Sequence, residues 1–459
     1  MSELKQASLE EQRVLKVRRW IYAYFLLLIF EGVLRKWGSL NFLVSSALLL
    51  VRDPVVLMIY YLAMRARAFP HNRFTRIWAI SLAVLCMLGL LQVFFNPWLG
   101  MFVVIYGIRC YCMHIPLIFV MAQVFEKEDV LRIGRWTLYL AGPMAILMVA
   151  QFFSSPNSII NRATLGEGST QIGSALGKIR PAGTFSYSMG AGSFNLLVAA
   201  FLIYSFVDTG WVSVRARVIA AVALVVVLPI SGSRGFVMSI GFVLFFAVAA
   251  GMFHRRLLKI TLQVVVLGVG VFFLLTLTSF FREGVLTFTT RWQQALGNSG
   301  SLNEAILQRF FGEFIHAFED LGQAPLLGYG LGLGSNVGAA LTVRSLGFLL
   351  AETEWERTVM EMGPIVAVFW LGARSVFGVS LYRWAWTCVR RGQALPWLLL
   401  GTECLGIFNG LLEQATNLGF LVFTTGLCLA AIRIAQEDET TLAADGMAVE
   451  NTRGVPQMV

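Results

Sequence analysis

Charged residues are scarce in this 459-residue chain, and their scarcity sets its class. Only 14% of the residues are Asp, Glu, Lys or Arg, whereas 57% are hydrophobic and the mean hydropathy is +0.72. Because a soluble globular domain carries roughly 25% charged residues, this composition excludes an ordinary soluble protein. Apolar runs of about 18 to 22 residues recur, each long enough to cross a bilayer as a helix. The sequence therefore predicts an all-α, polytopic integral membrane protein.

Residues that commonly bind metals are also few. The four histidines lie far apart, at positions 71, 114, 254 and 316, which argues against a histidine metal site. The six cysteines fall within apolar runs or on the inner side, where nothing supports a disulfide. Cys110 and Cys112 lack the spacing of a metal motif. We expect neither a metal nor another cofactor.

About twelve apolar runs divide the chain into spans and loops. The first run lacks a small-residue cleavage site, so it is interpreted as a retained span. Arg52, Asp53 and Pro54 interrupt the second run, which indicates a broken or re-entrant helix packed against protein. The predicted segments are a cytoplasmic segment 1–19, spans one to nine over 20–279 with an outer loop at 154–187, a large periplasmic loop with an amphipathic helix over 280–361, spans ten to twelve over 362–434, and a disordered cytoplasmic tail over 435–459.

Basic residues are unevenly distributed between the two sides of the predicted membrane. With the N-terminus inside, about 22 Lys and Arg residues lie in inner segments and about 11 in outer ones. Arg52, Arg109 and Arg374 remain within spans. The bias predicts that both termini are cytoplasmic. It also accounts for the net charge of +10 without a nucleic-acid partner.

The interval from Phe280 to Gly363 is the longest part of the body that is not continuously apolar. Asn303 can cap an amphipathic helix that would lie along the membrane surface or over a cavity. The glycines at 328, 330, 332 and 334 resemble a dinucleotide fingerprint, but no strand–turn–helix unit surrounds them. Glu352, Glu354 and Glu361 then lead into span ten. Glu residues in a first helical turn also complement the helix dipole, so a solvated helix start is the alternative for each.

Two arginines lie in short outer motifs. Arg180 precedes the run Pro-Ala-Gly-Thr-Phe, and Arg234 lies in a Ser-Gly-Ser-Arg-Gly turn between spans seven and eight. The turn places Arg234 beside the free N–H groups of the next helix, a combination that attracts phosphate. Gly- and Ser-rich outer loops are also common as simple connections.

Charges within or at the ends of spans need an explanation. Glu31 and Arg35 are one helical turn apart and can pair, while Lys36 and Trp37 suit the membrane interface. A carboxylate as deep as Glu31 usually turns toward the protein interior. Arg109, in the middle of the fourth span, needs a partner or a water-filled cavity.

In order along the chain, RPAGTF, SGSRG, PLLGYGLG and an acidic segment ending in E-x-G-P resemble the motifs of the bacterial O-antigen polymerase and O-antigen ligase superfamily. EGVLRKW followed by RDP is similar to its exopolysaccharide-polymerase branch. The resemblance implies a GT-C-like glycosyltransferase in the bacterial inner membrane, with a glycan on undecaprenyl diphosphate as donor and no required metal. Arg180 and Arg234 match the arginines that hold the donor diphosphate. Where the ligases carry a histidine, this chain has AETEWER, which counts against a lipid A-core ligase.

The resulting hypothesis is a polymerase of lipid-linked polysaccharide repeat units. Transfer from a lipid diphosphate needs cations at the leaving group and a base for the attacking hydroxyl. Arg180 and Arg234 are predicted to bind diphosphate with Arg291 or Arg309 assisting, and Glu352 or Glu354 to act as the base. Supporting roles are assigned to Glu31, Arg35, Arg109, Tyr329 and Glu361.

The expected partners are the lipid-linked donor, a glycan acceptor, the bilayer, a chain-length regulator and a flippase. Two alternatives stay open: an O-antigen-type ligase that uses another acceptor, and a transporter of polysaccharide or lipid-linked glycan. Twelve spans with internal charges also suit translocation. No inverted repeat is visible, however, and the polar residues concentrate on one side of the membrane. A lateral cavity at the outer face would favour the transferase, and a midplane site the carrier.

Overall fold

The computed structural model describes residues 2–38, 41–164, 171, 173–253, 255–299, 313–342, 350–351 and 353–453. Within these residues the regular structure is helical, apart from one isolated antiparallel bridge between Gly173 and Ile179. Eight of the described helices have the length and composition needed to cross a membrane. The chain is therefore a polytopic helical membrane protein, as the composition predicted.

The eight candidate spans follow the longest apolar runs of the sequence. Their apolar windows hold at most two charged residues each, so a bilayer can accommodate them. They are α4 (Arg73–Phe95), the continuous segment of α5 (Met101–Ile108), η3 (Arg109–Met113) and α6 (Pro116–Val124), α7 (Lys127–Phe153), α8 (Ser188–Val207), α10 (Arg234–Gly251), α11 (Arg255–Thr276), α16 (Glu354–Arg390) and the first part of α19 (Ala415–Arg453).

The described helices support eight spans and not the twelve or so expected. The other four apolar runs are shortened by charges or divided by helix breaks. Asp53 and Pro54 lie at one such break, as their place in the sequence indicated. The four runs correspond to α1 (Ser2–Val33) with the π-helical turn η1 (Leu34–Gly38), to α2 (Phe42–Leu48) with α3 (Arg52–Arg65), to α9 (Val214–Ile230), and to α17 (Leu395–Thr402) with α18 (Gly406–Asn409).

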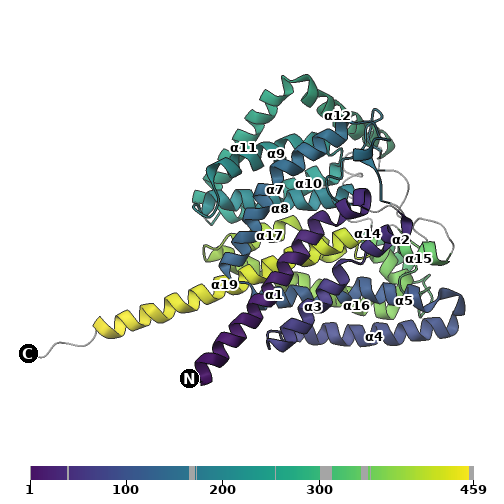
Figure 1. Ribbon diagram of the computed structural model, residues 1–459, viewed down its shortest axis with the longest axis horizontal. Helices are drawn as coiled ribbons and strands as arrows, with labels where there is room; N and C mark the ends of the chain where they lie inside the picture. Colours follow the sequence, from purple (N-terminus) through teal and green to yellow (C-terminus); the bar gives the residue numbers. More distant parts are fainter. Residues whose placement is uncertain are drawn as a thin grey trace, which may run out of the picture.

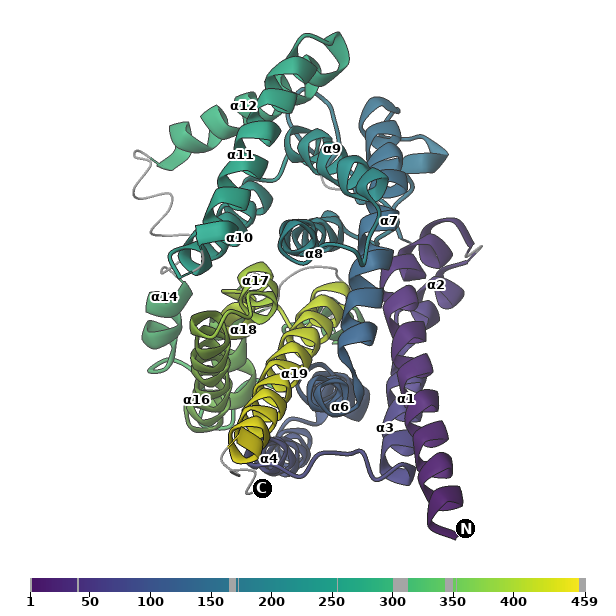
Figure 2. The ribbon, with the colours of Figure 1, turned by 90° about the vertical axis from the view of Figure 1, so that its left-hand side faces the viewer.

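The N- and C-terminal helices α1 and α19 emerge at the same end of the bundle (Figure 1). The opposite end carries α2, the start of α5, one end of α12 (Ser279–Ser299), and α15 (Asn336–Thr342). We call this opposite end the outer end, following the distribution of basic residues. Figure 2 looks from the end that carries the termini and shows α9–α12 on one side, α4, α6, α16 and α19 on the other, and α8 with α17 between them.

Ion pairs and capped carbonyls fasten the helices at the end that carries the termini. Arg18 of α1 pairs with Glu126 and, at 3.3 Å, with Asp129 at the start of α7. Arg433 of α19 donates to the carbonyls of Ala122 and Phe125, which close α6. The last carbonyls of a helix have no intrahelical partner, so an arginine satisfies them well.

Small residues allow the inner helices to approach closely. A methyl group added at Gly134 would lie 2.5 Å from the ring of Phe201, and one at Gly426 would lie 2.7 Å from the sulfur of Met121. Such contacts are typical of helix pairs inside membrane proteins. By contrast, only 11% of the apolar window of α11 is buried. Its exposed side chains, such as Val266 and Phe273, form a surface suited to lipid.

Candidate functional site

The two loops predicted to bind diphosphate meet at the outer end. The N–H of Ser174 donates to the carbonyl of Lys178 at 2.7 Å, and residues 173–179 form a tight hairpin. A methyl group added at Gly232 would lie 2.6 Å from Ser174 Oγ and 3.7 Å from Arg180 Cγ. The hairpin and Arg180 therefore pack directly against the turn that precedes Arg234.

The turn before α10 combines a glycine conformation with a helix cap. Gly232 has a φ of 56°, in the left-handed region that favours glycine. Ser233 caps α10 by accepting a hydrogen bond from the N–H of Phe236 at 3.3 Å. Arg234 is the first residue of this 18-residue helix. Its guanidinium thus belongs to a helix N-terminus, where free N–H groups and the helix dipole favour an anion.

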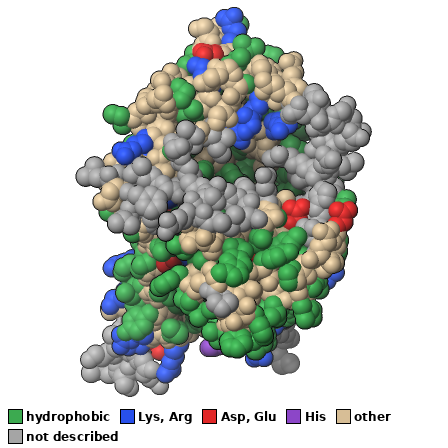
Figure 3. Space-filling model, turned by 90° about the vertical axis from the view of Figure 1, so that its right-hand side faces the viewer, with side chains coloured by type: hydrophobic (Ala, Val, Ile, Leu, Met, Phe, Trp, Pro, Cys, Tyr) green, Lys and Arg blue, Asp and Glu red, His purple; other side chains and the backbone are tan. Residues whose placement is uncertain are grey.

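Helix α12 holds the hairpin in place and adds a further cation. Arg291 donates from Nη1 to the carbonyl of Gly173 at 3.2 Å. Lys178 pairs with Glu283 of α12 at 2.7 Å. Arg291 therefore lies beside the hairpin, as its predicted assisting role requires. Figure 3 looks onto this end of the molecule and shows Lys and Arg side chains gathered beside a recess.

Two polar atoms of this cluster have unused hydrogen-bonding capacity. Arg180 Nε and Ser174 Oγ are buried and have no hydrogen-bond partner within the described chain. Buried polar groups in proteins are usually satisfied. We name this cluster, formed by Ser174, Arg180, Gly232 and Arg234, the arginine turn site. It offers cationic and hydroxyl groups at a helix N-terminus, which is the chemistry that an oxyanion needs.

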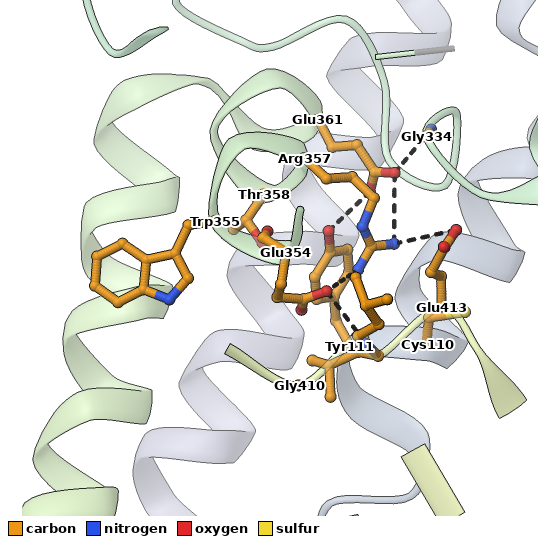
Figure 4. Close-up of polar contacts among 12 residues, drawn as sticks. Cys110, Tyr111, Gly334, Glu354, Trp355, Arg357, Thr358, Glu361, Gly410 and Glu413 are labelled. Carbon is orange, nitrogen blue, oxygen red and sulfur yellow. Dashed lines mark hydrogen bonds and ion pairs between the residues drawn. The ribbon is translucent and has the colours of Figure 1, made fainter. Parts of the chain in front are cut away.

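A second charged cluster lies inside the bundle, around Arg357 near the start of α16 (Figure 4). Arg357 is 1% exposed and pairs with Glu354. Its Nη1 also lies 3.9 Å from Glu361 Oε1 and 3.9 Å from Glu413 Oε2. One buried guanidinium thus holds three carboxylates from two parts of the chain.

Glu361 ties the glycine-rich segment 326–335 to α16. Its carboxylate accepts hydrogen bonds from the N–H groups of Gly332 at 3.0 Å and Gly334 at 2.9 Å, and from the hydroxyl of Tyr111 at 3.0 Å. Gly332 has a φ of 80°, and a methyl group there would lie 2.3 Å from the carbonyl oxygen of Val103. These glycines therefore permit close backbone packing around a buried carboxylate, and the supporting role of Glu361 is to anchor that segment.

Glu354, one of the two predicted bases, is enclosed. It is 0% exposed, pairs with Arg357 and, at 3.0 Å, with Arg374, and accepts the N–H of Leu412 at 3.2 Å. A base must reach the proton that it removes, and the burial and ion pairs of Glu354 disfavour that role. The geometry assigns Glu354 to the scaffold. Glu352, the other predicted base, lies outside the described residues.

Arg309 and most of the predicted amphipathic helix also lie outside the described residues. The last part of that helix is observed as α14 (Glu313–Asp320). Tyr329 donates its backbone N–H to the carbonyl of Met360 at 2.7 Å, and its side chain is 41% exposed. The backbone of Tyr329 therefore contributes to the fastening of the glycine-rich segment on α16.

Glu31 lies inside the protein, as expected for a carboxylate so deep in a span, and the burial of Lys36 shows that its interpretation as an interface anchor is wrong. Arg35 is 2% exposed and Lys36 is 0% exposed. Glu31 accepts from Arg52 Nε at 2.7 Å, whereas its distance to Arg35 is 3.9 Å. Arg52, which lies in the broken second apolar run, is thus a closer partner of Glu31 than Arg35 is.

Arg109 has the partner that its place in a span requires. Arg109 donates hydrogen bonds from Nε and Nη2 to the carboxylate of Asp53, at 2.8 Å each. His114 Nε2 lies 3.1 Å from the same carboxylate, and its Nδ1 lies 3.1 Å from the hydroxyl of Tyr24. The Arg-Asp-Pro motif therefore forms two separate ion pairs, one between Arg52 and Glu31 and the other between Asp53 and Arg109.

Several residues of these networks were not singled out from the sequence. Gln92 donates to the carbonyls of Leu327 and Glu361 and accepts from Leu331 N–H, which fixes the glycine-rich segment. Tyr111 and Glu413 complete the Arg357 cluster. Among these residues, Gln92 had a local sequence signal of its role, because it is a polar side chain within an apolar run. Partners more than 200 positions away leave no mark on local periodicity.

Among the described residues, no group of three or more His, Cys, Asp or Glu side chains is arranged to hold a metal ion. No protein-family model and no curated protein matches this chain. The assignment of a function therefore depends on the chemistry of the arginine turn site.

Proposed function

We propose that this protein is a polymerase of lipid-linked polysaccharide repeat units. It would transfer a glycan from undecaprenyl diphosphate to a sugar hydroxyl at the outer face of the bacterial inner membrane, without a metal. One observation carries the proposal: Arg180 packs against the turn that places Arg234 at the N-terminus of α10, on the outer end of a polytopic helical bundle.

The arrangement suits a diphosphate leaving group for three physical reasons. A guanidinium can contact phosphate oxygens through two parallel N–H groups. The N-terminus of a helix adds free N–H groups and a favourable dipole. Preorganised cations at the place where negative charge develops lower the barrier without a metal ion. Arg291 of α12, fastened to the hairpin that precedes Arg180, would assist.

The base remains a separate assignment within the proposal. Glu352 keeps its predicted role as the base. It belongs to the same acidic segment as Glu354 and lies two positions before it in the sequence. A partly buried carboxylate at a membrane mouth is suited to accept the proton of a sugar hydroxyl. The scaffold contacts of Glu354 would then hold this segment beside the outer face.

The proposal extends to the architecture. If α1, α2 with α3, α9, and α17 with α18 act as short or broken crossings, the bundle has the twelve or so crossings of a GT-C-like transferase. An even number of crossings agrees with two termini at one end, which would be the cytoplasmic side.

The test is elongation of undecaprenyl-diphosphate-linked repeat units by the purified protein in the presence of a metal chelator. We expect a ladder of products from the wild type. Arg180→Ala and Arg234→Ala should each lower the rate by roughly 10²- to 10³-fold, the usual cost of removing one charge-stabilising group. Arg383→Ala, a change of an exposed arginine in the second half of α16, is the matched control and should keep the full rate.

The same assay separates the alternatives. Polymerisation at the normal rate by both arginine variants would contradict the site. If the wild type carries lipid-linked glycan across a vesicle membrane without joining repeat units, the protein is a carrier and not a transferase. Transfer of the glycan to an acceptor that is not lipid-linked would identify a ligase.

A further inference from the structure

Lys36 is a buried cation without a counter-charge. It is 0% exposed and lies in the π-helical turn η1, at the outer end of α1. Its Nζ donates to the carbonyl of Gly183 at 2.7 Å and lies 4.7 Å from the ring centre of Trp37. No carboxylate of the described residues lies within 4.0 Å of this ammonium group. An ammonium group in this setting is costly to bury.

The other deeply buried cations of the bundle differ in this respect. Arg52 has Glu31 at 2.7 Å, Arg109 has Asp53 at 2.8 Å, and Arg357 has Glu354. Each of these three arginines therefore has a carboxylate of the protein as its partner. Lys36 has no carboxylate partner of this kind within the described chain, so its positive charge is available to act on a ligand near the loop that it contacts.

The acceptor of Lys36 belongs to the loop that carries Arg180. Gly183 also donates its N–H to Gln151 Oε1 at 2.7 Å, and its carbonyl accepts from the same side-chain amide at 3.1 Å. Thr184 Oγ1 donates to the carbonyl of Ile29 at 2.7 Å. These contacts fasten the segment after Arg180 to α1 and α7.

The motif EGVLRKW at the end of α1 is the platform for this segment. A methyl group at Gly32 would lie 2.3 Å from the carbonyl oxygen of Thr184, so the two backbones touch. Arg35 Nη1 donates to Ser186 Oγ at 3.1 Å. Gly183 follows Arg180 by three residues, which span at most about 11 Å. Lys36 therefore lies on the order of 10 Å from the arginine turn site, close enough for its positive charge to attract an anion bound there.

We propose that Lys36 is a positioning residue of the anion site: it holds the loop of Arg180 at the carbonyl of Gly183, and its positive charge strengthens the binding of a diphosphate by this loop. The inference rests on the proposed function in one respect, namely that the arginine turn site binds a diphosphate. At about 10 Å and an effective dielectric constant of about 20, one positive charge strengthens the binding of an anion by about tenfold.

This arrangement has a consequence that a purely structural lysine would not have. Replacing an uncompensated buried charge by an apolar side chain of similar length should stabilise the empty protein while weakening the ligand. The carbonyl of Gly183 keeps its hydrogen bond from Gln151, so the change leaves no orphaned acceptor. Stability and ligand binding should therefore move in opposite directions.

The experiment measures the Tm of the full-length protein in detergent with three additives: inorganic pyrophosphate, farnesyl diphosphate and farnesol. We expect Lys36→Met to raise the Tm of the empty protein and to bind both diphosphates about tenfold more weakly than the wild type. Farnesol, which lacks the diphosphate, should affect both proteins equally. Pyrophosphate alone distinguishes recognition of the anion from recognition of the lipid chain.

Two further variants keep the test decisive. Lys36→Gln retains a donor for the carbonyl of Gly183 without the charge, so it should show the same weakened binding even if Lys36→Met folds poorly. Arg35→Met is the matched control, because this neighbouring buried cation has a carboxylate 3.9 Å away, and its loss should lower the Tm.

Each outcome points to one conclusion. Weakened binding of diphosphates by both Lys36 variants, with an unchanged or raised Tm, supports the inference. Wild-type binding in both variants overturns the role of Lys36 but leaves the arginine turn site intact. A parallel loss of Tm and binding assigns Lys36 to the scaffold. A wild type that neither diphosphate stabilises overturns the anion site itself, and the inference with it.

Discussion

Two groups of arginines, one inside the bundle and one at the outer end, show how the same side chain serves different purposes. Arg357 is buried among three carboxylates, and Arg374 completes the group by pairing with Glu354. In the described part of the chain, no carboxylate forms an ion pair with Arg180 or Arg234, and Arg180 Nε has no hydrogen-bond partner there. In the first group, the arginines are paired with carboxylates of the protein. In the second group, hydrogen-bond donors remain available to a ligand.

The contrast teaches that a buried charge in this bundle is not by itself a sign of catalysis. A paired arginine with fixed neighbours gives rigidity and orientation, although burying such pairs is expensive. An arginine at the free N-terminus of a helix, next to a glycine turn, costs less and can accept a substrate. The predictions below separate these two roles, beginning with the largest effect.

Removal of Arg357 should be the most damaging change. Arg357→Met leaves three buried carboxylates without their common partner, and loss of one member of a buried pair typically costs about 3–5 kcal/mol of stability. Denaturant unfolding of the purified protein in detergent measures this loss. Arg180→Met, the comparison variant, should lose less than about 1 kcal/mol. Equal stability of the two variants would remove the distinction between the groups.

The glycine-rich segment should tolerate no side chain at Gly332. Its left-handed φ costs an alanine about 1–2 kcal/mol, and the clash with the carbonyl of Val103 adds about 1–3 kcal/mol. Gly332→Ala should therefore unfold at a clearly lower denaturant concentration. Gly372→Ala is the matched control, because a methyl group there has no neighbour within 4 Å. A stable Gly332→Ala protein would show that this segment does not fasten α16.

Arg234 should be sensitive to geometry as well as to charge. Arg234→Lys keeps the cation at the start of α10 but loses the planar pair of N–H groups that matches a phosphate. We expect the rate of polymerisation to fall about tenfold, with little change in stability, because an ammonium group keeps the charge but cannot form two parallel hydrogen bonds to a phosphate. A fully active lysine variant would indicate that charge alone is required.

The smallest effect is expected at the ion pair between the hairpin and α12. Lys178 and Glu283 are partly exposed, with side chains 21% and 44% accessible, so Glu283→Gln should change stability by less than about 1 kcal/mol. It should still loosen the hairpin that precedes Arg180 and lower the rate a few-fold. High salt should produce the same loss in the wild type, since salt screens an exposed pair. A salt-independent rate would contradict this.

Much of the fold could be predicted because the membrane restricts the chain severely. The composition requires helices, and eight of the longest apolar runs form helices of spanning length. The break at Arg52, Asp53 and Pro54 was visible locally, because proline and charge end a helix wherever they occur in an apolar run. The described helices show eight candidate spans, and the other four crossings stay a prediction, since hydrophobicity alone does not reveal where a run is divided by a turn, as it is between α17 and α18.

The site was predictable only in part. The Ser-Gly-Ser-Arg-Gly turn predicted a helix N-terminus that carries an arginine, because helix capping depends on residues that are close in the sequence. That this turn packs on Arg180, more than 50 positions earlier, could not be read from either motif. The burial of Glu354, one of the two predicted bases, could not be predicted for the same reason, because Arg374 and Leu412, which enclose it, come from other parts of the chain.

The sequence by itself determined the class of the protein, the places of its longest spans and the asymmetry of its basic residues, because hydrophobic length and charge act through the surrounding lipid and water. The tertiary structure alone decided which charges are partners: Glu31 with Arg52, Asp53 with Arg109, and Lys36 with a carbonyl instead of a carboxylate. Those pairings depend on distances between segments that only the folded bundle brings together. They are what separates the scaffold from the site.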